Sequence, residues 1–187
     1  MKFGIDIPGT VKDAVSLDKA NKNNIWQDEI KLDMNNSSVA FKLCNKGEKY
    51  PVGHTKITSH LIYIFKIDMT SKAQYVAGGH LTDVPTYMTY SSVVSRDMVF
   101  IGLLMDALKN LDFLASDIQN TFLESPTKEH TFFYAGYEWK AYKEKVVIAV
   151  RSLYDLKYPA LQFRISLDET LGNRIGYKSS LADPDLW

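Results

Sequence analysis

Two strand-like runs, at residues 60–68 and 72–80, are separated by only three residues. The first reads HLIYIFKID and the second KAQYVAGGH, and β-branched and aromatic side chains are frequent in the first. Because so short a connection leaves two strands side by side, the pair predicts a β-hairpin. Lys66 and Lys72 flank its predicted turn.

Helical spacing recurs in three other places. Trp26, Ile30 and Met34 predict a helix over 24–34, where Asn24 with Gln27 resembles a capping arrangement. A broad apolar face predicts a buried helix that starts near Ser95. A third helix is expected from about Pro159 to Gly172, since proline favours a helix start and glycine a stop.

Short alternating or apolar runs predict further strands. They lie at 38–43, 112–118, 130–136 and 145–150. The order of helices and strands fits an α+β domain with a mixed or antiparallel sheet and packed helices. Residues 1–23 are polar and rich in turn formers, and they are expected to form a loosely ordered lead-in to a domain over 24–187.

Composition excludes some classes of protein. Lys plus Arg and Asp plus Glu both number 22, so no net field attracts a polyanion. A single cysteine, Cys44, rules out an internal disulfide, and the four histidines lack the spacing of a zinc site. The longest apolar run, at 98–105, is far shorter than a membrane span, so no membrane partner is expected. A soluble, cytoplasmic protein is the default expectation, with a nuclear one left open.

Asp117 stands at the end of the predicted strand 112–118 and is followed at once by a polar and aromatic turn. Aspartate at a strand end is ordinary turn chemistry. It is also a suitable ligand for a hard cation at the lip of a sheet. Residue pattern alone leaves both readings open.

The chain resembles the reverse transcriptase of copia-type retrotransposons in four segments that occur in the same order and at similar spacing. These segments are KAQYVAGGHLTDVPTYMTYSSVVSRD (72–97), LASDIQNTFLESP (114–126), VRSLYDLKYPALQF (150–163) and GYKSSLADPDLW (176–187). The likeness extends over about residues 24–187. It implies the fingers and an incomplete palm of an RNA-directed DNA polymerase.

The resemblance implies a role for several residues. Asp117 would be a catalytic carboxylate and a ligand of Mg²⁺, or of Mn²⁺ in its place, and the backbone carbonyl of Ile118 would be a second metal contact. Phe122 would lie under the sugar of the incoming nucleotide. Lys72 and Lys157 would meet phosphate. The implied partners are an RNA or DNA primer-template, a deoxynucleoside triphosphate and other parts of the polyprotein.

The family uses three carboxylates, and the pair that lies in a Tyr-x-Asp-Asp hairpin is absent from this sequence. Asp183 and Asp185 belong to the preceding segment and do not replace it. Charge is also lost inside the motifs, where Gln74 and Leu161 stand at arginine positions and Asp155 at a glycine position. A polyprotein fragment without polymerase activity of its own is therefore expected, and a palm cut short predicts poor solubility. A non-catalytic remnant that binds RNA or protein, and an unrelated metal-dependent hydrolase, are the alternatives.

Overall fold

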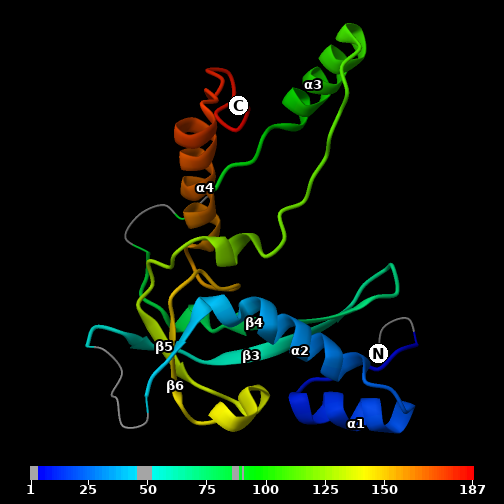
Figure 1. Ribbon diagram of the computed structural model, residues 1–187, viewed down its shortest axis with the longest axis vertical. Helices are drawn as coiled ribbons and strands as arrows, with labels where there is room; N and C mark the ends of the chain where they lie inside the picture. The colour runs from blue at the N-terminus through cyan, green and yellow to red at the C-terminus, as the bar shows by residue number, and fades with distance from the viewer. Residues whose placement is uncertain (1–3, 46–51, 86–88, 90) are drawn as a thin grey trace.

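The computed structural model describes residues 4–45, 52–85, 89 and 91–187, and within them the chain has an α+β fold. Two sheets and the N-terminal helices form one end of the molecule, and two further helices extend away from it (Figure 1). The helices are α1 (Val11–Asn21), α2 (Ile25–Ser37), α3 (Arg96–Lys109) and α4 (Pro159–Glu169). The strands are β1 (Phe41–Leu43), β2 (Thr55–Lys56), β3 (Ser59–Phe65), β4 (Ser71–Ala77), β5 (Thr131–Tyr134) and β6 (Val146–Ala149).

The predicted hairpin is confirmed as β3 and β4, which pair antiparallel over seven residues, from Ser59 opposite Ala77 to Phe65 opposite Ser71. Its turn is fixed by the carboxylate of Asp68, which accepts hydrogen bonds from the backbone N–H and the hydroxyl of Thr70. The other sheet has the strand order β1-β6-β5-β2 and is mixed, because β2 runs parallel to β5 while the other pairs are antiparallel.

Helix α2 lies along the outer edge of β4 and closes it. The backbone N–H of Tyr75 donates to Oδ2 of Asp33 at 2.7 Å, so a helix carboxylate takes the place that a neighbouring strand would fill. An edge strand with free N–H groups is a site of unwanted pairing, and Asp33 satisfies one of these groups on β4.

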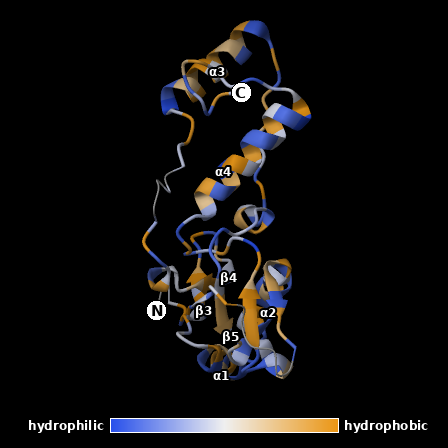
Figure 2. Ribbon diagram, turned by 90° about the vertical axis from the view of Figure 1, so that its left-hand side faces the viewer, coloured by the Kyte–Doolittle hydropathy of each residue, from blue (hydrophilic) through white to orange (hydrophobic). Residues whose placement is uncertain are grey.

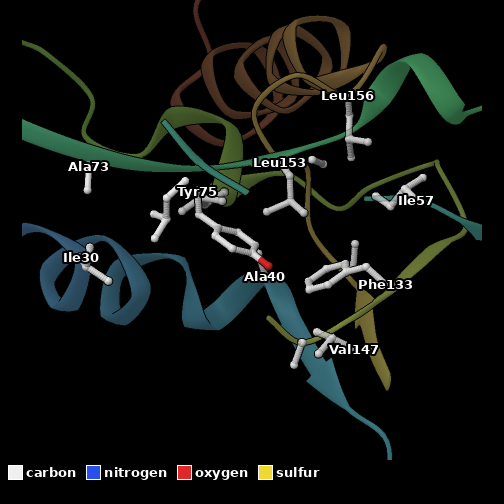
Figure 3. Packing of buried hydrophobic residues seen from close by; sticks show 14 of the residues in the cluster. Ile30, Ala40, Ile57, Ala73, Tyr75, Phe133, Val147, Leu153 and Leu156 are labelled. Carbon is white, nitrogen blue, oxygen red and sulfur yellow. The ribbon is translucent and has the colours of Figure 1, made fainter. Parts of the chain in front are cut away.

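An aromatic cluster joins the two sheets into one core. Tyr75 and Phe133, from different sheets, point into the same interior with ring centroids 5.9 Å apart (Figure 3). Phe41 packs edge-to-face on both rings, and the indole N–H of Trp139 donates to the Tyr75 hydroxyl at 3.0 Å. The two pairs that Phe41 makes place the positive edge of one ring near the negative face of another, which stabilises them beyond area burial alone.

The expected loosely ordered lead-in was wrong for residues 11–21, which form α1; residues 1–3 lie outside the described residues. The helix is capped by the Thr10 hydroxyl, and it buries Ala14 and Asp18 completely. Its Ala14 belongs to the core, and Val11 and Leu17 pack against that core. Its packing also depends on a polar contact that sequence spacing cannot display.

That contact is made by Asp18, which caps the next helix. Its two carboxylate oxygens accept from the backbone N–H groups of Trp26 and Gln27, at 3.1 and 2.9 Å. The predicted helix over 24–34 is confirmed as α2, but the expected cap was wrong: Asn24 makes no side-chain bond to the helix backbone. Two of the N-terminal N–H groups are satisfied by a residue eight and nine positions upstream.

Replacing Asp18 with alanine should lower the free energy of unfolding by about 2–3 kcal/mol, because two N–H groups at a buried helix start lose a charged acceptor. Denaturation in urea measures this loss. The matched control is Asp28→Ala, since Asp28 is an exposed acid in the first turn of α2 and should cost about 0.5 kcal/mol through the helix dipole alone. Equal losses in the two variants would contradict the capping role.

The helix predicted from Ser95 is confirmed as α3, and the Ser95 hydroxyl accepts from the N–H of Met98. Its predicted burial was wrong, because no residue of α3 is buried. The helix projects away from the sheets and carries hydrophobic residues along its length (Figure 2). An apolar face predicts burial only where the fold supplies a partner, and no other described element covers this helix.

The strand predicted at 112–118 was also wrong. These residues are extended coil, exposed to solvent, and no strand among the described residues pairs with them. The strands predicted at 130–136 and 145–150 are confirmed as β5 and β6, and the run 38–43 forms a short 3₁₀ turn followed by β1.

Helix α4 begins at Pro159 as predicted but does not stop at Gly172. A π-helical turn, η5 (Thr170–Ile175), carries it on to Gly176, whose φ of +86° suits glycine.

Two buried tyrosines make stability depend on alkaline pH. Burial raises the pKa of the Tyr63 hydroxyl to about 12 and that of Tyr75 further, and the carboxylate of Glu138 adds to both rises. Unfolded tyrosine ionises near pH 10, so the stability held by the neutral hydroxyls is full below that pH and falls as pH rises toward 12. Urea midpoints should therefore decline across this window. In Tyr63→Phe the decline should be shallower, whereas Tyr177→Phe, at an exposed site, should match the parent protein.

In the part of the chain that the structure describes, no helix combines the length and the apolar character needed to cross a bilayer.

Candidate functional site

Asp117 lies in the exposed coil between α3 and the 3₁₀ turn η3 (Thr121–Glu124). Its carboxylate makes no hydrogen bond or ion pair with any described residue, so both oxygens are open to solvent or to a ligand. The neighbouring carbonyl, that of Ile118, accepts from the hydroxyl of Thr121 at 2.5 Å and starts η3. Any metal at Ile118 would use the second lone pair of that carbonyl.

Phe122 leads from this coil back to the body of the molecule. Its ring is half-buried and lies 5.3 Å from the ring of Tyr154 at an angle of 60°. The turn η3 is short and tight, with Asn120 in the left-handed region at φ +53° before it. The turn therefore constrains the backbone that carries Phe122.

Lys72 reaches the same ring from β4. It is paired opposite Ile64 in the hairpin and is half-buried. Its ammonium lies 5.9 Å from the centroid of Tyr154, which is within the range of a cation–π interaction. The ammonium also acts on the carboxyl of Asp33, on the neighbouring helix α2.

Tyr154 is thus the residue around which the others gather. Its backbone carbonyl accepts from the N–H of Ala77 at the end of β4, which fixes the loop after β6 against the hairpin. Burial raises the pKa of the Tyr154 hydroxyl above its ordinary value, and the carboxylates of Asp33 and Asp117 add to the rise. The hydroxyl is therefore a neutral donor or acceptor at physiological pH.

Asp33 is the acid on the inner side of this group. Burial raises the pKa of its carboxyl, while the hydrogen bond from the Tyr75 N–H and the charge of Lys72 offset part of that rise. Asp33, Lys72, Tyr154, Phe122 and Asp117 are called the Tyr154 cluster below. Sequence reasoning had assigned no role to Tyr154 or Asp33, although Tyr154 stands in one of the four segments on which the resemblance rests.

Lys157 does not join the Tyr154 cluster. Its ammonium donates to the backbone carbonyls of Thr82 and Asp83, the second at 3.0 Å. Its backbone N–H donates to the buried carboxylate of Glu129 at 2.7 Å, as does that of Tyr158 at 3.1 Å. These bonds hold the loop against the segment after the hairpin. A phosphate contact by Lys157 stays a prediction, and it would require the ammonium to leave both carbonyls.

The two C-terminal acids are engaged elsewhere in the fold. Asp183 is buried and accepts from the N–H of Ser95, before α3, at 3.0 Å and from the N–H of Asp185 at 2.9 Å. Asp185 pairs with Arg164, which also holds Asp168 at 2.6 Å. These carboxylates join the C-terminal segment to α4 and to the start of α3.

The acids of the Tyr154 cluster do not form a ready-made metal site. Within the described ranges no three His, Cys, Asp or Glu side chains come together as a metal site. Asp117 is the open carboxylate of the cluster, and Mg²⁺ is commonly held by one or two carboxylates, waters and substrate phosphates. The Tyr154 cluster therefore lacks the set of acids that a two-ion centre needs.

Comparison with known proteins identified no matching family, no matching curated protein and no matching solved structure.

Proposed function

We propose that the chain is part of a retrotransposon polyprotein, comprising the fingers and the first part of the palm of an RNA-directed DNA polymerase of the copia type, and that it keeps a nucleotide site but does not polymerise. The observation that carries this proposal is the Tyr154 cluster. Lys72, Asp117 and Phe122 were assigned to one nucleotide site by resemblance alone. Lys72 and Phe122 both lie beside the ring of Tyr154, and the charge of Asp117, five residues before Phe122, acts on the Tyr154 hydroxyl.

The proposal is supported by the fact that the Tyr154 cluster contains residues from segments that lie far apart in the sequence. Three of the four resembling segments contribute to it: the first through Lys72, the second through Asp117 and Phe122, and the third through Tyr154. The fourth segment lies apart, with Asp183 bonded to Ser95. Residues 86–88 and 90 of the first segment lie outside the described residues.

In this proposal each residue has a physical task. Lys72 offers a positive charge to the triphosphate, since an ammonium on a flexible stem binds phosphate as a point charge. Phe122 gives the sugar an apolar floor that Tyr154 supports from behind. Asp117 takes one coordination position of the Mg²⁺ that accompanies the nucleotide, and that ion supplies charge neutralisation when bound.

Polymerase activity is not expected from this chain. A carboxylate about 4 Å from a unit charge contributes about 4 kcal/mol at an effective dielectric of 20, and each 1.36 kcal/mol changes a rate about tenfold. Without two of three acid ligands the rate should fall at least about a thousandfold. Primer extension should therefore give no product above background.

Calorimetric titration with Mg²⁺ and deoxyadenosine triphosphate tests the nucleotide site. Lys72→Met should weaken binding by about tenfold, because one desolvated phosphate contact is lost. Lys66→Met is the matched control, since Lys66 is an exposed lysine in the turn of the same hairpin and should leave binding unchanged. Absence of binding by the parent protein, or equal losses in both variants, would contradict the proposal.

A non-catalytic remnant that binds a protein is the second candidate, and α3 is the observation that favours it. The helix is apolar and lies in solvent, as a helix does when its partner belongs to another chain or to another part of the polyprotein. For RNA binding, the balance of 22 basic and 22 acidic residues offers no such support. Filter binding of a primer-template at several salt concentrations distinguishes an RNA-binding remnant from a protein-binding one, because phosphate contacts make the affinity for nucleic acid fall steeply as salt rises.

A further inference from the structure

A pocket of about 640 Å³ lies between α1, α2 and the 3₁₀ segment η4 (Tyr137–Tyr142), away from the Tyr154 cluster. Its volume falls in the range of sites for small organic ligands, about 300–1,000 Å³. Two walls come from the consecutive helices α1 and α2, and the third comes from a segment about 100 residues further along the chain. The folded arrangement creates the pocket, and no local motif indicates it.

The floor of the pocket is apolar. Val11 and Val15 contribute from α1, and Ile30 and Met34 from α2. Val15 remains 43% exposed although it sits on a helix packed against another, so its side chain faces the pocket without filling it. Such a floor gains free energy when an apolar chain covers it, at about 25 cal/mol per Å² of apolar surface removed from water.

The rim is positively charged. Lys31, Lys140 and Lys143 line the pocket, and all three are exposed at its edge. Lys143 lies 5.2 Å from the centroid of the Tyr137 ring and 3.5 Å from the carboxylate of the exposed Glu144. An exposed ion pair of this kind contributes little and does not prevent the lysine from meeting a second anion.

One acid, Glu138, also lines the pocket and has to be weighed against the three lysines. Its Oε1 is buried and has no hydrogen-bond partner among the described residues. Its charge acts on the hydroxyls of Tyr63 and Tyr75, which lie on the core side. The carboxylate therefore faces inward, and the open rim presents the lysines.

Lys140 is held in a strained backbone conformation at this rim. Its φ of +49° and ψ of −107° lie where residues other than glycine are rarely found. Such a conformation persists only when the surroundings impose it, and here it directs a lysine to the pocket wall. A glycine at this position would relieve the strain and remove the charge together.

We infer that this pocket binds a small amphipathic anion, a carboxylate on an apolar chain, with the chain on the floor of α1 and α2 and the carboxylate among the three lysines. Apolar area and positive charge meet in one concave site, and only a ligand with both properties satisfies both. The inference is independent of the nucleotide site, because no residue of the Tyr154 cluster lines the pocket.

Titration with decanoate below its micelle concentration tests the inference, followed by the amide resonances of α1 and α2 and by Trp139 fluorescence. Decyltrimethylammonium, with the same chain and the opposite charge, is the matched ligand. The expected result is saturable decanoate binding that is about tenfold tighter than that of decyltrimethylammonium. Equal binding of both ligands, or shifts confined to α3, would overturn the inference.

Two variants distinguish binding in this pocket from non-specific binding elsewhere on the protein. Val15→Glu places an acid on the exposed floor and should abolish decanoate binding while strengthening that of decyltrimethylammonium. Lys140→Gly with Lys31→Met should weaken decanoate about tenfold and leave the fold intact, as circular dichroism would show. Lys19→Met, on α1 but outside the pocket, is the control and should bind as the parent does. If Lys19→Met lowers decanoate affinity as much as the double variant, the pocket assignment is wrong.

Discussion

Replacing Phe133 with alanine is expected to lower the free energy of unfolding by about 3–5 kcal/mol, the cost of removing a large aromatic side chain from a packed core. Phe133 is 1% exposed and touches Phe41, Tyr75 and Trp139 at once. Its loss leaves a cavity between the two sheets. Because a domain of this size is stable by about 5–15 kcal/mol, the variant should be close to unfolding at room temperature.

Urea denaturation followed by far-ultraviolet circular dichroism measures the effect of Phe133→Ala. The same substitution at Phe100 is the matched control, since that side chain is 59% exposed on α3 and should cost less than about 1 kcal/mol. Similar losses at Phe133 and Phe100 would show that the aromatic cluster is not the centre of the core.

The second large effect concerns α3. The parent protein should self-associate or aggregate as its concentration rises, because Phe100, Leu104 and Leu108 are 59%, 57% and 72% exposed on one helix. Exposed apolar surface of this kind drives association. Leu104→Glu with Leu108→Glu should weaken the association by at least about tenfold without lowering the urea midpoint, since neither side chain contributes to the core.

Sedimentation velocity at several concentrations measures this change. Leu32→Glu with Val39→Glu provides the matched control, because these two residues are 54% and 58% exposed but lie outside α3. Association that disappears in the control and persists in the α3 variant would show that α3 is not the surface through which the protein self-associates. A monodisperse parent protein at all concentrations would contradict the account of α3 altogether.

Local patterns predicted those parts of the fold that depend on local interactions. The hairpin at β3 and β4 followed from two β-rich runs and a three-residue connection, and the starts of α3 and α4 followed from Ser95 and Pro159. Such signals act over a few residues, so they can be read without knowing the rest of the fold.

Features that depend on distant partners could not be predicted in this way. The cap on α2 comes from Asp18, and the edge of β4 is closed by Asp33. Neither contact leaves a pattern in the sequence. The same reason explains why α3 is exposed and why no strand forms at 112–118. An apolar helix face shows only that burial would be favourable, and an extended run shows only that pairing would be favourable. Neither pattern shows whether the fold supplies a partner.

The candidate site likewise contains residues that could be assigned from the sequence and residues that could not. Resemblance alone assigned Lys72, Asp117 and Phe122 to one place. In the fold Lys72 and Phe122 lie beside Tyr154, whereas Asp117 stands in the exposed coil and acts on the Tyr154 hydroxyl only through its charge. Resemblance could not assign Tyr154, whose importance depends on the loop after β6 bonding to Ala77. It grouped Lys157 with the nucleotide contacts, whereas the ammonium of Lys157 is bonded to the carbonyls of Thr82 and Asp83.

The central claim is that Asp117, Lys72, Phe122 and Tyr154 form one site for a nucleotide and its metal ion. Titration with Mn²⁺ and deoxyadenosine triphosphate, followed by paramagnetic broadening of amide and aromatic resonances, tests it directly. The account predicts that the signals of Asp117, Phe122 and Tyr154 broaden first, and that Asp117→Asn removes this broadening while the protein stays folded. Broadening that is unchanged in Asp117→Asn, or that begins at Asp183 and Asp185 instead, would contradict the account.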